Sequence, residues 1–232
     1  MTDRAAIVQV RKLADAESFR SHLEGLDLDL SFDSDLVTGA DAPLAAALKV
    51  RLSPRVTRTI GNRFAVLPME GWDATNDGRP TELVARRWER FGSSGAKLVW
   101  GGEAVAVRPD GRANPNQLCI GPESESDLAG LRSRLVASHS DRFGRTDDLL
   151  VGLQLTHSGR WSRPAGSPVP RVGYRHPLLD RRVPVTDTSV LSDDELDDLS
   201  KSFVEAAEVA ADAGFDFVDV KACHGYLLHE ML

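Results

Sequence analysis

The feature that most constrains the fold is an alternation of short apolar runs with amphipathic segments, repeated four times from Asn62 to the end of the chain. The apolar runs predict strands at Phe64–Met69, Ala96–Trp100, Leu149–Leu155 and Phe215–Val220. Strands that alternate with helices run parallel and are joined by right-handed crossovers. The chain is therefore predicted to be an α/β protein with a parallel sheet.

Apolar residues at helical spacing predict one helix after each of the first three strands. The buried stripes of these helices are expected at Val84, Trp88 and Phe91, then Leu128, Leu131 and Leu135, then Leu196, Leu199, Phe203, Ala207 and Ala210. The third helix should begin at Ser192, because Ser192 and Glu195 have the spacing of a capping box, and it should end at Gly214.

The long loops all follow strands, so they gather at the carboxyl ends of the strands. In a (β/α)8 TIM barrel this edge carries the active site, and a complete barrel takes about 250 residues. Only four strand units fit between Asn62 and Leu232. We therefore expect residues 61–232 to form the N-terminal half of such a barrel, truncated after about four units, and residues 1–60 to form a lead-in segment outside it with one short helix.

Polar side chains follow all four predicted strands: Glu70, Glu103, Gln154 and His157, and then Lys221, His224 and Tyr226. The last strand is expected to be buried, with Phe217, Asp219 and Lys221 on one face. Any one of these polar groups could be a hydrogen-bonded group in the core. Four consecutive strands that end in polar groups instead predict the polar floor of one pocket.

Composition and charge exclude several classes of function. A net charge of −7 with scattered basic residues argues against nucleic acid or membrane partners. Cys119 and Cys223 form neither a disulfide framework nor a CxxC pair, the histidine spacing fits no zinc motif, and no apolar run is long enough to span a membrane. We expect a cytoplasmic protein with a small-molecule substrate and no metal, with Cys223 as a packing residue; a homo-oligomer stays open.

Four stretches resemble the Old Yellow Enzyme family of FMN-dependent oxidoreductases. They are NRFAVLPM from Asn62, GGEAVAVRPDGR from Gly101, VGLQLTHSGR from Val151 and FVEAAEVAADAGFDFVDVKACHGYLLHEML from Phe203. They occur in the order of that family's first four strands, and the last stretch is the most specific. The resemblance implies a (β/α)8 barrel with FMN over the carboxyl ends of the strands.

The resemblance also implies roles for residues around the flavin. Pro68, Met69 and Glu70 would contact FMN largely through backbone groups, and Ala104 would lie near its polar edge. Gln154 would hydrogen-bond the pyrimidine half of the ring, a task that suits an amide because it offers both a donor and an acceptor.

Three catalytic roles follow in the same way. Tyr226 would protonate the substrate, while His224 and Lys221 would hold the substrate carbonyl. NAD(P)H would reduce the flavin, and the reduced flavin would pass hydride to an activated alkene or related electrophile by ping-pong kinetics. Lys221 and Glu70 depart from the better-known members, which have histidine and Thr or Cys there. A carboxylate beside the flavin needs a proton or a partner, and Lys221 is the expected partner.

Two other interpretations stay open at this point. Lys221 could be a Schiff-base nucleophile in an aldolase-like barrel, with Asp219 taking part in proton transfer. Alternatively, the chain could be a catalytically incomplete fragment, because TIM barrels commonly bind phosphate with loops after strands seven and eight.

Overall fold

The computed structural model describes residues 8–232, and the chain divides between Pro43 and Leu44 into two compact units. The first unit holds α1 (Ala16–Gly25) and the 3-10 turns η1 (Val10–Lys12) and η2 (Gly39–Asp41). The N-cap of α1 is Asp15, whose carboxylate accepts the Ser18 backbone N–H at 2.8 Å. The one helix expected in the lead-in segment is therefore present; the first seven residues of that segment lie outside the described residues.

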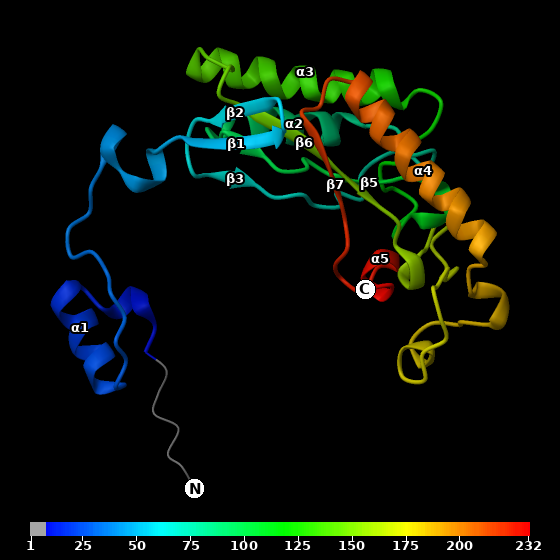
Figure 1. The fold of residues 1–232 in the computed structure, drawn as a ribbon, viewed down its shortest axis with the longest axis horizontal. Helices are drawn as coiled ribbons and strands as arrows, with labels where there is room; N and C mark the ends of the chain where they lie inside the picture. The colour runs from blue at the N-terminus through cyan, green and yellow to red at the C-terminus, as the bar shows by residue number, and fades with distance from the viewer. Residues whose placement is uncertain (1–7) are drawn as a thin grey trace, which may run out of the picture. The chain divides into compact units, whose positions relative to one another are not determined.

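The second unit contains the strands and the remaining helices (Figure 1). Its strands are β1 (Leu48–Ser53), β2 (Val56–Ile60), β3 (Ala65–Val66), β4 (Leu98–Val99), β5 (Ala104–Ala106), β6 (Leu150–Thr156) and β7 (Phe217–Val220). Its α-helices are α2 (Glu82–Ser93), α3 (Ser124–Phe143), α4 (Asp193–Asp212) and α5 (Leu227–Glu230). Its 3-10 turns are η4 (Pro109–Gly111), η5 (Gly159–Trp161), η6 (Leu179–Arg181) and η7 (Asp187–Ser189), and η3 (Pro43–Ala45) lies at the junction of the two units.

The strand β6 organises the parallel sheet. One edge of β6 pairs first with β4, at Leu150, and then with β5, at Gln154. The other edge pairs with β7 over Gly152 to Leu155, and β3 pairs with β4. All of these pairs are parallel. The pairing gives the order β3, then β4 and β5 side by side along one edge of β6, then β6, then β7. The predicted strand–helix alternation with parallel strands is confirmed.

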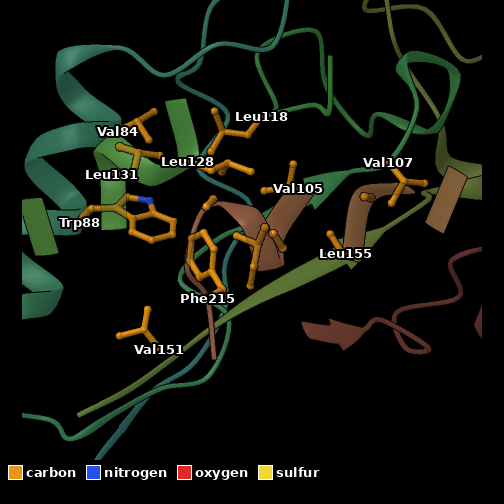
Figure 2. Close-up of a cluster of buried hydrophobic side chains, with 14 of the residues drawn as sticks. Val84, Trp88, Val105, Val107, Leu118, Leu128, Leu131, Val151, Leu155 and Phe215 are labelled. Atoms are coloured by element: carbon orange, nitrogen blue, oxygen red, sulfur yellow. The ribbon is translucent and has the colours of Figure 1, made fainter. Parts of the chain in front are cut away.

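The hydrophobic core lies between the sheet and the helices. Val151, Leu153 and Leu155 of β6 belong to one buried cluster with residues of α2, α3 and α4 (Figure 2). Trp88 of α2 is fully buried there and meets the Phe215 ring edge-on at 5.9 Å. Full burial of one such side chain contributes about 1.5–3 kcal/mol, so this cluster fixes the helices against the sheet. The predicted stripes of α2 and α3 face this core.

The opposite face of β6 carries Gly152 and Gln154. A Cβ atom at Gly152 would lie 2.3 Å from the Phe217 ring and 2.6 Å from the Trp100 carbonyl oxygen. Phe217 and Trp100 themselves meet edge-on at 5.3 Å across this position. Glycine is therefore required at residue 152, because the two aromatic side chains close over the strand there.

Four predictions of secondary structure need correction. Phe64–Met69 and Ala96–Trp100 form only the short strands β3 and β4, and the loop predicted after Trp100 contains the unpredicted strand β5. The β1–β2 hairpin was also not predicted, because alternation over five or six residues is a weak signal beside the acidic and Ala-rich patches around it.

The hairpin packs at the amino ends of the parallel strands. Ile60 is buried, the Gly61 N–H donates to the Asp148 carbonyl at 3.0 Å, and Arg58 forms an ion pair with Asp216 at 3.0 Å. The predicted boundary near residue 60 falls at the end of β2, whereas the division between the two compact units follows Pro43.

The expectation of a fully buried last strand is wrong. Val220 of β7 is 47% exposed, and the other three residues of the strand are half-buried. The physical reason is that β7 pairs along one edge only: within residues 8–232 no strand pairs with its other edge. An apolar sequence shows that burial of a segment would be favourable. The exposure of the segment in the fold depends on whether a strand pairs with each of its edges.

The helix α4 begins as its sequence predicts. The Ser192 side chain accepts the Glu195 N–H, and the Glu195 carboxylate accepts the Ser192 N–H at 2.9 Å, which completes the capping box. The buried side of α4 includes Leu199 and Ala210. Among the helices of the described residues, none combines the length and apolar character that a bilayer span requires.

We predict opposite effects for two glycine-to-alanine substitutions. Gly152→Ala should lower the free energy of unfolding by about 1–3 kcal/mol, because the new methyl group overlaps a ring and a carbonyl. Gly130→Ala, at an exposed position of α3 with no atom within 4 Å of the new Cβ, should raise it by about 0.5–1 kcal/mol. Urea unfolding measures both, and equal effects of the two substitutions would contradict the packing described for Gly152.

Candidate active site

A cavity of about 530 Å³ lies at the carboxyl ends of the parallel strands. It is called the main cavity below. Its lining comes from segments that follow β3, β4 and β7 and from β6 itself: Leu67, Pro68, Met69, Glu70, Trp72, Trp100, Gln154, Lys221, Cys223 and His224. The lining combines apolar and aromatic side chains with a few polar groups, which is the usual composition of a small-molecule site.

The carboxylate of Glu70 is the centre of a buried polar network. Its Oε1 accepts the Lys221 ammonium at 2.7 Å, and its Oε2 accepts the Tyr226 hydroxyl at 2.9 Å. The indole N–H of Trp72 donates to the same Oε2 at 3.3 Å. The side chains of Glu70 and Lys221 are only 8% and 5% exposed. The expected pairing of Glu70 with Lys221 is confirmed, and this pairing explains how a carboxylate can stand in the cavity.

The same network holds Tyr226 in its neutral form. Burial raises the pKa of the Tyr226 hydroxyl, and the negative charge of Glu70 raises it further. The ammonium of Lys221 lies 4.3 Å from the centre of the Tyr226 ring, within the range of a cation–π contact. Lys221, Glu70 and Tyr226 are thus positioned by one another.

The amide of Gln154 is oriented by a neighbouring strand. Gln154 of β6 lies opposite Asp219 of β7, and its Nε2 donates to the Asp219 carboxylate at 2.6 Å. Within the described residues nothing else hydrogen-bonds this side chain, so Oε1 and the second N–H are available to a ligand. Asp219 therefore determines which end of the amide faces the cavity.

His224 stands at the rim of the cavity on a strained turn. Its φ is +61°, an uncommon value for a residue with a side chain, and Gly225 follows with φ +68°. The imidazole is exposed, and its ring centre lies 6.0 Å from that of Tyr226. Cys223 beside it is exposed and lines the cavity, so the expectation that Cys223 is a packing residue is wrong.

Comparison of the sequence with protein-family models gives one match. The model of the NADH:flavin oxidoreductase / NADH oxidase family matches residues 56–232, well over half of the chain. The chain belongs to this family. The predicted resemblance to the Old Yellow Enzyme group is thereby confirmed at the level of the family.

Curated relatives agree with this assignment. The chain is 28% identical over 178 residues to an NADPH dehydrogenase of Bacillus velezensis, covering 75% of this chain and 48% of the relative. It is 29% identical over 178 residues to an NADPH dehydrogenase of Bacillus cytotoxicus, covering 75% and 46%. The chain thus spans about half the length of the curated relatives it matches.

Two solved structures share the fold. Old Yellow Enzyme from Pichia sp. AKU4542 superposes with a TM-score of 0.61 at 19% identity, over 82% of this chain and 48% of that one. The structure described as TcOYE with pHBA gives a TM-score of 0.56 at 24% identity, over 81% and 53%. The predicted fold class, the first units of a (β/α)8 barrel, is confirmed.

Of the residues predicted to contact the flavin, all but Ala104 line the main cavity. Pro68, Met69, Glu70 and Gln154 line the main cavity. Ala104 does not: it is fully buried in β5, its N–H donates to the Met69 carbonyl, and its carbonyl accepts Gln117 Nε2 at 3.0 Å. The roles of all these residues toward a flavin stay predictions.

Two of the polar residues expected on the pocket floor serve the scaffold instead. Glu103 is fully buried, forms an ion pair with Arg87 of α2 at 2.8 Å and accepts the Gly71 N–H. Burial raises the pKa of Glu103, against the opposing charge of Arg87. His157 is buried and accepts the Gly159 N–H at 3.1 Å. The floor is therefore formed by Glu70, Gln154 and Lys221 rather than by every polar residue at a strand end.

Sequence reasoning missed the contribution of Trp72 to the site. Trp72 lies in a loop without periodicity and has a φ of +53°, so no pattern in the sequence predicts where its side chain points.

The Glu70–Lys221 ion pair argues against the Schiff-base alternative. A lysine that attacks carbonyls must be a free amine, whereas the Lys221 ammonium is held by Glu70 and lies over an aromatic ring.

We predict that Glu70→Gln lowers the pKa of Tyr226. The chain has two tyrosines, so in a Tyr174→Phe background ultraviolet difference spectra of tyrosinate report on Tyr226 alone. With Glu70 present, Tyr226 should titrate well above the ordinary value of about 10, and loss of the carboxylate charge should bring the titration down. An unchanged titration in Glu70→Gln would contradict the network.

The raised pKa of Tyr226 also predicts that the free energy of unfolding falls at alkaline pH. Because the folded-state pKa of Tyr226 is raised, its contribution to stability is present below pH about 10 and is lost as the pH rises through the folded-state pKa. In the Tyr174→Phe background, Glu70→Gln should reduce this loss, which urea unfolding as a function of pH measures.

Proposed function

We propose that this chain carries the flavin and substrate site of an FMN-dependent oxidoreductase that uses NAD(P)H to reduce an activated alkene or a related electrophile. The observation that carries the proposal is the cluster of Tyr226, Lys221 and Glu70 at the carboxyl ends of the parallel strands. Through the Glu70 carboxylate, the cluster joins the Lys221 ammonium, which lines the main cavity, to the protonated Tyr226 hydroxyl, in a chain of the NADH:flavin oxidoreductase family.

The main cavity fits the ring system of a flavin. Its volume of about 530 Å³ lies within the range of about 300–1,000 Å³ for small-molecule pockets. Pro68, Met69 and Trp100 give it apolar walls, and Gln154 offers Oε1 and one N–H, which match a ring edge that both donates and accepts. Bound FMN would supply hydride chemistry that no side chain of the protein provides.

Lys221 and His224 would hold the oxygen of the electrophile. The ammonium of Lys221 has three N–H groups, and Glu70 accepts one of them. A second N–H can donate to a substrate carbonyl, while the imidazole of His224, exposed at the rim, supplies the other donor. Two donors at one carbonyl oxygen polarise the conjugated double bond and stabilise the negative charge that develops on the oxygen.

Tyr226 would supply the proton. Its raised pKa keeps the hydroxyl protonated at neutral pH, so the proton is present on the phenol oxygen when the substrate binds. After transfer to a substrate carbon, the phenolate would face the Glu70 carboxylate. Lys221 offsets this repulsion, since its ammonium lies 2.7 Å from Glu70 and 4.3 Å from the ring centre. The Lys221 ammonium thus lowers the cost of the step, whereas the Glu70 carboxylate favours return of a proton to Tyr226.

We predict that Tyr226→Phe separates the two halves of the reaction. After incubation with FMN, wild type and variant should both retain a flavin absorbance band that NADPH bleaches. The variant should reduce an enone substrate about 10²–10⁴-fold more slowly, the usual contribution of a positioned general acid. Tyr174→Phe, which changes a tyrosine that does not line the main cavity, is the matched control. No flavin retained by the wild-type chain, or equal alkene rates in the two variants, would contradict the proposal.

The order of the reaction has its own test. One pocket that serves NADPH and acceptor in turn gives parallel lines in double-reciprocal plots of initial rate. Intersecting lines, with neither substrate competing with the other, would contradict the ping-pong mechanism while leaving the flavin site intact.

A further inference from the structure

A second cavity, of about 310 Å³, adjoins the main one on the side of Tyr226. It is called the distal cavity below. It shares Trp72 and His224 with the main cavity, and its lining is completed by Ala113, Asn114, Trp161, Arg163 and Tyr226. Because Tyr226 lines it, a ligand in the distal cavity lies within reach of the proposed proton donor.

The distal cavity contains a positive charge without a partner. Within residues 8–232 no carboxylate forms an ion pair with Arg163, and no acceptor takes its guanidinium N–H groups. No acidic residue lines the cavity. By contrast, Arg79 in another surface cavity is paired with Asp127 at 2.8 Å. Arg163 is an exposed residue that water can solvate, and in a chain of net charge −7 it makes the cavity beside Tyr226 locally positive, which favours an anionic ligand.

The walls that carry this charge are held in place. The backbone N–H of Arg163 donates to the Arg112 carbonyl at 2.7 Å, which joins the loop after β6 to the loop after β5. Trp161 packs against a small buried cluster made by Val172, Val183 and Val185. The backbone of Arg163 and the indole of Trp161 are therefore held by contacts between loops, while the exposed guanidinium stays free to turn toward a ligand.

Asn114 adds a second donor to the distal cavity. Its Oδ1 accepts the Asn116 N–H at 2.9 Å, which orients the amide, and in the described part of the chain its own NH2 group has no acceptor. An arginine fork and an amide NH2 in one cavity offer donors only. This combination favours a carboxylate over a neutral polar group.

We propose that the distal cavity binds the carboxylate of a planar, unsaturated or aromatic substrate. The guanidinium of Arg163 and the amide of Asn114 would hold the carboxylate, and the indoles of Trp72 and Trp161 would pack against the flat apolar body. Lys221 cannot supply this selectivity, because Glu70 neutralises its charge. The assignment of this ligand as the alkene substrate rests on the proposed function, whereas the carboxylate site itself does not.

The test compares two probes of nearly equal shape, cinnamate and its neutral analogue cinnamamide. Dissociation constants are measured on the full chain from shifts of the tryptophan indole N–H signals in NMR, without FMN or NADPH. Wild type should bind cinnamate about tenfold more tightly than cinnamamide, the lower end for a hydrogen bond to a charged group. Arg163→Met should abolish this preference and Arg163→Lys should retain part of it. Arg55→Met, at an exposed arginine of the β1–β2 turn, should leave it unchanged.

The indoles identify which cavity is occupied, because Trp161 lines only the distal cavity and Trp100 only the main one. Shifts at Trp161 that disappear in Arg163→Met support the proposal. Equal affinity for the two probes, a preference that survives Arg163→Met, shifts confined to Trp100, or no binding of either probe would overturn it. Failure of the proposed function gives a different result: no flavin is reduced, while cinnamate still shifts Trp161.

Discussion

Parallel pairing along both edges of one buried strand is the constraint on which the rest of this structure depends. All seven residues of β6 are buried, with β4 and β5 on one edge and β7 on the other. Alternation then sends Val151, Leu153 and Leu155 toward the helices and leaves Gln154 on the opposite face. Because the strands run the same way, the loops that follow them meet at one end, and both cavities lie there.

The sequence predicts this scaffold well wherever burial follows a regular period. The stripes of α2, α3 and α4 and the capping box at Ser192 are present as expected. The failures have a common physical cause. Strands β3 and β4 have two residues each, and β5 lies among glycines after a break in the same strand, so none of them is long enough to show alternation. The exposure of β7 depends on what pairs with its second edge, and no pattern within a strand contains that information.

One contact of the site, the Glu70–Lys221 ion pair, could be predicted because a buried charge needs an opposite charge beside it. A buried carboxylate at residue 70 needs a partner, and Lys221 is the partner found, although 150 residues separate the two positions along the chain. Chemical type alone could not distinguish Glu70 from Glu103: one faces the cavity, while the other faces α2. Trp72 and Arg163 lie on irregular loops, and their directions depend on backbone geometry and on contacts between loops rather than on spacing.

The Glu70–Lys221 ion pair also restricts how a site of this kind can evolve. Removing one partner of a buried pair leaves an uncompensated charge and typically costs about 3–5 kcal/mol, a large part of the stability of an ordinary domain. Replacing both partners by apolar residues of similar size is often nearly neutral. A lineage that exchanges this pair for another donor set must therefore cross an unstable single-substitution intermediate or change both positions together. Substitutions at the two positions are therefore coupled, although Glu70 and Lys221 follow strands at opposite edges of the sheet.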